Sequence, residues 1–215
     1  MSPSELRPKI LVVGSGGHAK VVIDVLRAEG KYEISGCVSN QTDVEEVLGV
    51  PLLGDDSKME EIYASGIKIA IIAIGDNRVR LALAEKVSRL GFEFGNAISP
   101  LAYLSRDVKV GNGIVMMPRV VVHPGSEIED HVILNTAATV DHDCKIGRGC
   151  HIAPGCNLAG NVTVEEGAFL GVGTSAIPGV RVGAWGILGA GSVIVGDAPG
   201  RTLSMGVPAR AKKKL

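Results

Sequence analysis

Beyond Pro100, apolar residues recur with a period of six. Every sixth residue from Leu104 to Ile194 is apolar, sixteen positions in all, where a chain with 46% hydrophobic residues would show about seven. The residues two places earlier, from Ala102 to Ser192, are all small or β-branched. Because residues i and i+2 of a strand point to the same side, both series face one interior.

This period is typical of a parallel β-helix, in which each hexapeptide forms one short strand and one tight turn. Three hexapeptides close a triangular coil, and the next coil stacks on it at roughly 4.8 Å. Sixteen repeats then give about 5.3 coils, or roughly 25 Å of prism. Five glycines are expected in turns that need unusual backbone angles, namely Gly111, Gly147, Gly171, Gly183 and Gly189.

The first hundred residues follow a different pattern. Apolar runs at 9–13 and 67–74 predict buried parallel strands, and residues 33–38 a further strand. Helices are expected at 18–29, 55–64 and 78–90, the last with a buried face of Val79, Leu83, Val87 and Leu90. The fold class is therefore a small Rossmann-like α/β domain, residues 1–99, followed by a β-helix, residues 100–215, with a short C-terminal tail.

Composition and charge narrow the function classes. A formal net charge of −1 leaves no large basic field, so a nucleic-acid partner is not expected. The chain has no apolar stretch before Gly14 long enough for a signal peptide or a spanning helix, so no membrane insertion is expected. Four cysteines without a secretion signal favour reduced thiols and a cytoplasmic location. Three of them fall at interior positions and are expected to be packed thiols: Cys144, Cys150 and Cys156.

The segment GSGGHAK follows a predicted strand and opens a predicted helix. Glycines at such a place let the backbone approach a phosphate, which the free amides of a helix N-terminus then bind. Gly14, Gly16 and Gly17 do not form the full dinucleotide fingerprint. A mononucleotide phosphate site and a tight turn that binds nothing are both compatible with this loop.

Two of the five histidines are candidates for chemistry. His142 lies between Asp141 and Asp143 and outside the interior columns. A neighbouring carboxylate raises the basicity of an imidazole, as a general base near neutrality requires; a plain surface pair is the alternative. His151 is also expected on the outside of a coil, where a ligand can lie.

The other prism histidines are expected to have no catalytic role. His123 and His131 fall at turn or outward positions and are expected to be solvated. A three-histidine zinc centre needs one close pair, which the histidine spacing lacks, so no metal is expected.

Six stretches resemble a known family and follow its order: KILVVGSGGHAKVV, IAIGDNRVR, VILNTAATVDHDCKIG, HIAPGCNLAGNV, FLGVGTSAIPGV and GVPAR. The family comprises bacterial acetyltransferases that modify nucleotide-activated amino sugars, together with related sialic acid O-acetyltransferases. The resemblance implies a left-handed β-helix, a homotrimer, and acetyl-CoA in the groove between neighbouring prisms.

The resemblance also implies roles for individual residues. His142 matches the general base and Asp143 its partner carboxylate, which is usually glutamate in the family. Cofactor contacts map onto Asn135, His151, Gly160, Val172 and Ala190. The nucleotide sugar is expected at Gly16, Gly17, His18, Gly75 and Asn77. Ser39 and Asn40 stand where the family commonly has paired acidic residues at the nucleotide, which leaves the choice between UDP and GDP open.

Together these features predict an acetyl-CoA-dependent N-acetyltransferase. Its acceptor is the 4-amino group of a UDP- or GDP-linked amino-dideoxy sugar in bacterial surface-glycan biosynthesis, and the amine attacks directly with His142 as the base. One alternative is O-acetylation of sialic acid or another hydroxyl acceptor. Another is a non-catalytic scaffold that senses a sugar nucleotide.

Overall fold

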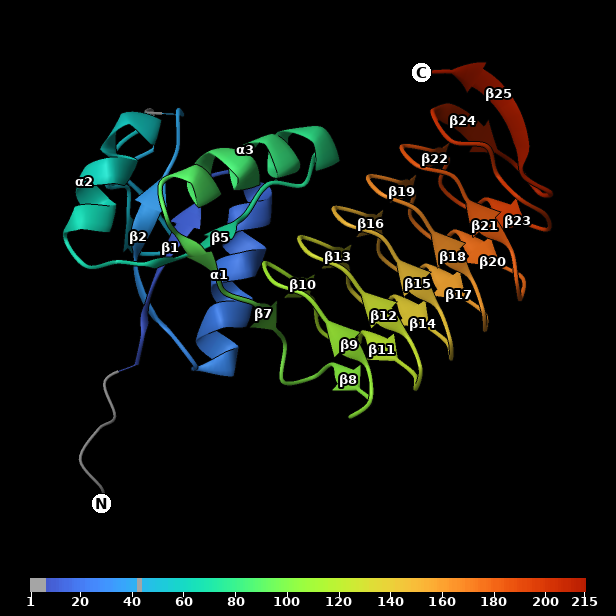
Figure 1. Cartoon of the computed structure of the whole chain (residues 1–215), viewed down its shortest axis with the longest axis horizontal. Helices are drawn as coiled ribbons and strands as arrows, with labels where there is room; N and C mark the ends of the chain where they lie inside the picture. Colours follow the sequence, from blue (N-terminus) through green and yellow to red (C-terminus); the bar gives the residue numbers. More distant parts are fainter. Residues whose placement is uncertain (1–6, 42–43) are drawn as a thin grey trace.

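The computed structural model describes residues 7–41 and 44–215, which form an α/β unit and a β-helical prism side by side (Figure 1). The unit is built on a parallel sheet in the order β2-β1-β5-β6. Its strands are β1 (Lys9–Val13), β2 (Glu33–Val38), β5 (Ile69–Ile72) and β6 (Glu93–Phe94). β3 (Glu46–Val47) and β4 (Val50–Pro51) form a small hairpin. The predicted open sheet is therefore confirmed.

Helices cover both faces of this sheet. α1 (Gly17–Glu29) packs on one face. α2 (Met59–Ala64), which follows a 3-10 turn at Asp56–Lys58, and α3 (Asn77–Arg89) pack on the other. Asp55 begins the second helical segment by accepting a hydrogen bond from the Ser57 amide at 2.8 Å, the role expected of an N-cap residue.

The prediction of the buried face of α3 was wrong at the N-terminal end of the helix. Val79 is 49% exposed, whereas Arg80 is 1% exposed. The reason is that α3 packs against the prism as well as against its own sheet, so its buried stripe is turned toward the prism. That stripe consists of Asn77, Arg80, Leu81, Ala84 and Val87.

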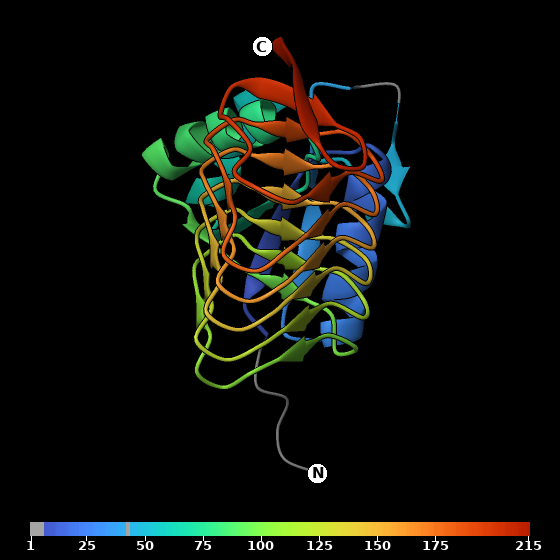
Figure 2. The ribbon, with the colours of Figure 1, turned by 90° about the vertical axis from the view of Figure 1, so that its right-hand side faces the viewer.

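The prism is a left-handed β-helix with three parallel faces, whose coils stack one above the other in Figure 2. Partners are eighteen residues apart, as in the pairing of Val115 with Ile133 and of Ile133 with His151.

Each face is a column of short strands. Face 1 comprises β7 (Ala97–Ile98), β10 (Val115–Met116), β13 (Ile133–Leu134), β16 (His151–Ile152), β19 (Phe169–Leu170), β22 (Ile187–Leu188) and β24 (Thr202–Met205), with β25 (Arg210–Lys214) antiparallel to β24. Face 2 comprises β8 (Tyr103–Leu104), β11 (Val121–Val122), β14 (Thr139–Val140), β17 (Asn157–Leu158), β20 (Ser175–Ala176) and β23 (Val193–Ile194). Face 3 comprises β9 (Lys109–Val110), β12 (Glu127–Ile128), β15 (Lys145–Ile146), β18 (Thr163–Val164) and β21 (Arg181–Val182).

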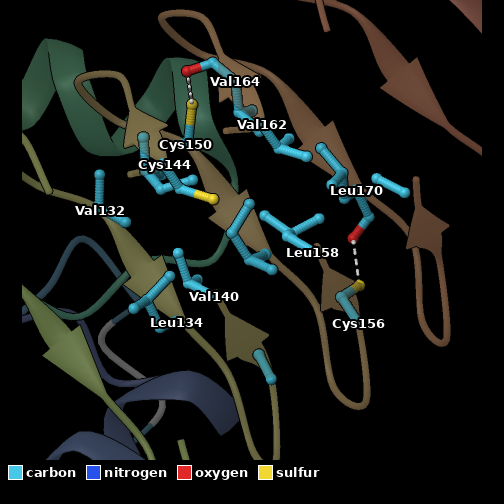
Figure 3. Packing of buried hydrophobic residues seen from close by; sticks show 14 of the residues in the cluster. Val132, Leu134, Val140, Cys144, Cys150, Cys156, Leu158, Val162, Val164 and Leu170 are labelled. Carbon is cyan, nitrogen blue, oxygen red and sulfur yellow. Dashed lines mark hydrogen bonds between the residues drawn. The ribbon is translucent and has the colours of Figure 1, made fainter. Parts of the chain in front are cut away.

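The interior of the prism follows the predicted columns. Cys144, Cys150 and Cys156 are fully buried among aliphatic side chains (Figure 3). The thiols also donate weakly to carbonyls of the next coil, at 2.9 Å from Cys150 to Glu165 and 3.1 Å from Cys156 to Gly171. Aliphatic side chains and thiols therefore fill the interior.

The role predicted for the five turn glycines was wrong, because none of them has a positive φ. The left-handed positions lie two residues further on, for example at Gly149 and Gly173. What requires glycine at Gly171 is close approach between coils: a Cβ there would lie 2.7 Å from the Ala190 nitrogen and the Leu188 oxygen. Backbone atoms cannot move aside as a side chain can.

Face 1 is the side of the prism that meets the α/β unit. α1 contacts β7. β7 pairs with β10, so the first strand of the prism lies just before the predicted boundary at Ser99–Pro100. Within residues 7–41 and 44–215, no helix has the length and apolar character needed to cross a membrane.

Candidate active site

His142 lies in an open turn at the corner between faces 2 and 3. Its side chain is 55% exposed, and its Nδ1 is 2.8 Å from Asp143 Oδ2. Asp143 reaches this position from a left-handed backbone, with φ of 58°. The hydrogen bond to Asp143, followed by the charges of Asp141 and Asp143, raises the pKa of His142 above its usual value. Among the described residues Nε2 has no hydrogen-bond partner, so it can accept a proton.

Gly160 lies directly beneath this imidazole, one coil further along the prism. A Cβ at Gly160 would lie 2.5 Å from both Cε1 and Nε2 of His142. The absence of a side chain at Gly160 therefore gives the ring the space it occupies. Gly160 meets the ring and stands at the same corner, although the resemblance suggested it only as a cofactor contact.

His151 lies on face 1, and both nitrogens of its ring have hydrogen-bond partners. Its Nδ1 is 3.2 Å from the Gly75 carbonyl oxygen, and its Nε2 is 3.1 Å from Asn135 Nδ2. The Thr136 amide donates to Asn135 Oδ1 at 2.8 Å, which turns the amide nitrogen of Asn135 toward the ring. A carbonyl can only accept and an NH₂ group only donate, so His151 carries its proton on Nδ1.

His151 lies outside the prism interior, as predicted, but the α/β unit covers it and leaves it 9% exposed. Burial, with a smaller effect of the Arg80 charge, lowers its pKa to about 4. His131, expected to be solvated, is only 5% exposed because Phe94 packs edge-on against its ring at 4.5 Å. Burial lowers the pKa of His131 to about 4 as well. His123 is exposed, as expected.

The remaining predicted cofactor residues lie at the corner between faces 1 and 2. Val172 and Ala190 are in equivalent turns of successive coils, and both are exposed. The Gly191 amide donates to the Val172 carbonyl at 2.8 Å, which holds these two turns together. Together with Asn135 they form a line along one edge of the prism.

The predicted nucleotide residues gather around a cavity of about 370 Å³ at the carboxyl ends of β1, β2 and β5. It is lined by six of the seven predicted residues: Gly16, Gly17, His18, Ser39, Asn40 and Gly75. Within residues 7–41 and 44–215, no side chain caps the N-terminus of α1, which begins at this cavity. Its amides are therefore available to an anion.

Sequence reasoning missed other residues of this cavity. Ser15 donates to Ser39 Oγ at 2.8 Å, and Gln41 and Asp56 also line the wall. Their proximity arises because parallel strands end at one edge, and a polar residue after each strand is the only sequence signal for it. Burial, then the Arg80 charge, lowers the pKa of His18 to about 4.

Asn77 lies outside this cavity, at the contact between α3 and the prism. It is 8% exposed, and its Nδ2 donates to the carbonyls of Gly167 and Ala168, at 3.1 Å each. A larger cavity of about 650 Å³, near Arg89 and Arg148, contains none of the predicted site residues. Within the described ranges, no three His, Cys, Asp or Glu side chains are grouped so that they could hold a metal ion.

The single chain thus brings the cavity, His151 and Asn135 together through Gly75, but it places His142 elsewhere. The α/β unit covers face 1 and the corner between faces 3 and 1, where Gly149 and Cys150 accept hydrogen bonds from α3. His142 stands at the one corner that face 1 does not border. Within one chain, His142 is therefore separated from the cavity and from His151.

Comparison with known proteins shows to which class of protein this chain belongs. Residues 9–87 match the family described as PglD N-terminal domain, and residues 125–160 match the bacterial transferase hexapeptide (six repeats). The crystal structure of PerB from Caulobacter crescentus, in complex with CoA and GDP-perosamine, is 45% identical over 95% of this chain and 97% of that one, with a TM-score of 0.92. The protein is therefore a hexapeptide-repeat acetyltransferase.

Two further relatives narrow the class. The acetyltransferase domain of PglB from Neisseria gonorrhoeae, in complex with acetyl coenzyme A, is 37% identical, covers 96% of this chain and all of that one, and gives a TM-score of 0.89. GDP-perosamine N-acetyltransferase of Escherichia coli O157:H7 is 25% identical over 79% of this chain and 78% of that protein. The chain belongs to the family of bacterial nucleotide-amino-sugar N-acetyltransferases. Its match to the bifunctional protein GlmU of Heliobacterium modesticaldum, at 34% identity, covers 61% of this chain but only 30% of that protein.

Proposed function

We propose that this protein transfers an acetyl group from acetyl-CoA to the 4-amino group of a UDP- or GDP-linked amino-dideoxy sugar, in the cytoplasm, for bacterial surface-glycan biosynthesis. The observation that carries the proposal is the His142–Asp143 pair, an exposed imidazole with one nitrogen tied to a carboxylate at 2.8 Å and the other free. The ligands named for PerB and the PglB domain support both substrates.

The chemistry at His142 follows from this geometry. Acetyl-CoA supplies an activated acyl carbon, and the sugar amine must lose a proton when it forms the amide bond to that carbon. His142 Nε2 accepts this proton, and Asp143 stabilises the resulting imidazolium through Nδ1–H. The imidazolium then returns the proton to the departing thiolate of CoA. A positioned general base contributes typically ~10²–10⁴-fold to the rate.

The α/β unit, residues 1–99, would hold the nucleotide sugar. Gly16 and Gly17 have no side chain to obstruct a diphosphate, and the uncapped N-terminus of α1 offers its amides to it. Ser39 and Asn40 lie on the cavity wall beside β2 and offer neutral hydrogen-bonding groups to the base. His18 and Gly75 close the end of the cavity that meets the prism, next to His151.

Acetyl-CoA would lie along the prism, residues 100–215, on Asn135, His151, Gly160, Val172 and Ala190. Asn135, Val172 and Ala190 lie at the corner between faces 1 and 2, Gly160 lies at the corner between faces 2 and 3, and His151 lies on face 1. No single groove of one chain therefore contains them all. We therefore propose a homotrimer in which acetyl-CoA lies between neighbouring prisms. Apolar side chains exposed on face 2 and its two corners support this contact: Leu101, Tyr103, Val172, Ile177 and Val195.

The direct test replaces His142 with alanine and, separately, with asparagine. Acetyl transfer to GDP- and UDP-linked 4-amino sugars should fall at least ~10²-fold, with the circular dichroism spectrum unchanged. His123→Ala is the matched control, because His123 is an exposed histidine at the same corner one coil earlier. Near-normal turnover of His142→Ala would contradict the base assignment, and turnover of sialic acid instead of amino sugars would favour O-acetylation.

A further inference from the structure

Arg80 is buried between the α/β unit and the prism, with 1% of its surface exposed. No carboxylate is among its hydrogen-bond partners within the described residues. Burying a charge without a counter-ion is costly unless dipoles replace the lost water. The partners are instead five backbone carbonyls and one amide oxygen, an arrangement that uses all three nitrogens of the planar guanidinium.

The hydrogen bonds of Arg80 join three parts of the molecule. Nε donates to the His131 carbonyl at 2.9 Å, and Nη2 donates to the Gly149 and Cys150 carbonyls at 2.7 and 3.3 Å, so two successive coils of the prism are engaged. Nη2 also donates to Asn77 Oδ1 at 2.8 Å. Nη1 donates to the carbonyls of the loop after β5, at 3.1 Å to Ile74 and 3.2 Å to Gly75.

The Gly75 carbonyl links Arg80 to the site. It accepts from Arg80 Nη1 on one side and from His151 Nδ1, also at 3.2 Å, on the other. The same residue lines the nucleotide cavity. A carbonyl held by the guanidinium therefore fixes which nitrogen of His151 carries the proton and which faces Asn135. The field of the guanidinium adds to burial in lowering the pKa of His151 and of His18, which keeps both rings neutral.

We propose that Arg80 is a positioning residue for acetyl transfer: its fork of hydrogen bonds holds the Gly75 carbonyl, and through it His151, so that the nucleotide cavity and the acyl-donor contacts on the prism stay in register. The effect on turnover rests on the function proposed above. The effect on the His151 ring does not, because it follows from the contacts alone. Lysine in place of arginine would keep the charge and lose the fork.

The test compares Arg80→Lys with the wild-type protein and with Arg89→Lys, an exposed arginine at the other end of α3. Long-range ¹H–¹⁵N spectra of the histidine rings in the full-length protein report the His151 tautomer, assigned with a His151→Asn variant. The wild-type ring should be protonated on Nδ1 alone and stay neutral to pH 5. Arg80→Lys should give a mixed tautomer and lower kcat by about 10-fold or more at equal folded fraction, whereas Arg89→Lys should change neither.

The ring spectrum separates the possible outcomes. A folded Arg80→Lys protein whose His151 keeps its single tautomer and its kcat overturns the proposal, since a purely structural role would lower stability alone. If Arg80→Lys does not fold, the wild-type spectrum decides, because a His151 ring that titrates near pH 6.5 or is protonated on Nε2 overturns it. A changed tautomer in a protein that acetylates no amino sugar would leave the positioning role standing and refute the proposed function instead.

Discussion

Replacing Gly160 with alanine tests the geometry of the proposed base without touching His142. The backbone of Gly160 is outside the left-handed region, so alanine introduces no strain there. The new methyl group would lie 2.5 Å from Cε1 and Nε2 of His142. Because non-bonded carbons prefer separations of about 3.5 Å or more, the ring must move by about 1 Å. His142 is exposed enough to move, so the protein should fold normally.

The expected effect is on turnover. A misplacement of about 1 Å at a reacting group can reduce the rate by about 10²-fold, which corresponds to about 2.7 kcal/mol in the activation free energy. The assay is steady-state acetyl transfer with both substrates varied. Gly196→Ala is the matched control, because Gly196 lies in the same column of turns, also outside the left-handed region, with no atom within 4 Å of its added Cβ.

A double-mutant comparison shows whether the methyl acts through the ring. In a His142→Ala background the ring is absent, so Gly160→Ala should add almost nothing to the loss. Full activity of Gly160→Ala would refute the placement of the imidazole. A large additional loss in the His142→Ala background would show that Gly160 acts on acetyl-CoA directly, independently of the base.

Three further results are expected. Activity should rise with pH through the pKa of His142, which Asp143 raises; Asp143→Asn should move this limb to lower pH in rate profiles from pH 5 to 9, and an unmoved limb would contradict the pairing. The folded-state pKa values of His131 and His151 are about 4, below about 6.5 in the unfolded chain. The free energy of unfolding is therefore not reduced by these rings above pH 6.5, and it falls as the pH drops toward 4, by up to about 3 kcal/mol for each ring. In urea titrations between these pH values, His131→Gln should lower the number of protons taken up on unfolding by about one. An unchanged dependence of the unfolding free energy on pH would count against this. The buried thiols, whose pKa burial raises to about 12 at Cys150, should react with disulfide reagents only after unfolding, and rapid labelling of the native protein would disprove this.

The six-residue period was sufficient to predict the prism because it records which side chains point inward. It does not record what covers the outer faces, and the errors on the histidines and on the buried face of α3 arise there. His131 and Arg80 are buried only because the α/β unit packs on the prism at the corner between faces 3 and 1. Nothing in the local sequence of either residue carries that information.

The candidate site was predicted unevenly for the same reason. Ser39 and Gly75 follow parallel strands whose carboxyl ends share one edge, so they meet in one cavity, as expected. Asn77 follows the same strand as Gly75, but the first turn of α3 directs its side chain to the prism carbonyls at Gly167 and Ala168. Placing it correctly requires the packing of the two units, which the pattern of one segment does not contain.

The separation of His142 from the nucleotide cavity leads to a last prediction, on subunit mixing. If each site takes its base from one chain and its cavity from the next around a closed ring, inactive chains with different defects should complement one another. Gly16→Glu places a carboxylate at the N-terminus of α1, where it would repel a diphosphate, and its backbone tolerates a side chain. Random 1:1 assembly with His142→Ala chains pairs an intact base with an intact cavity at about one quarter of the interfaces. Mixed oligomers should therefore regain about a quarter of wild-type activity, although each variant alone is inactive. A site contained within one chain would regain none, so an inactive mixture of well-folded oligomers would refute the shared site while leaving the role of His142 to its own test.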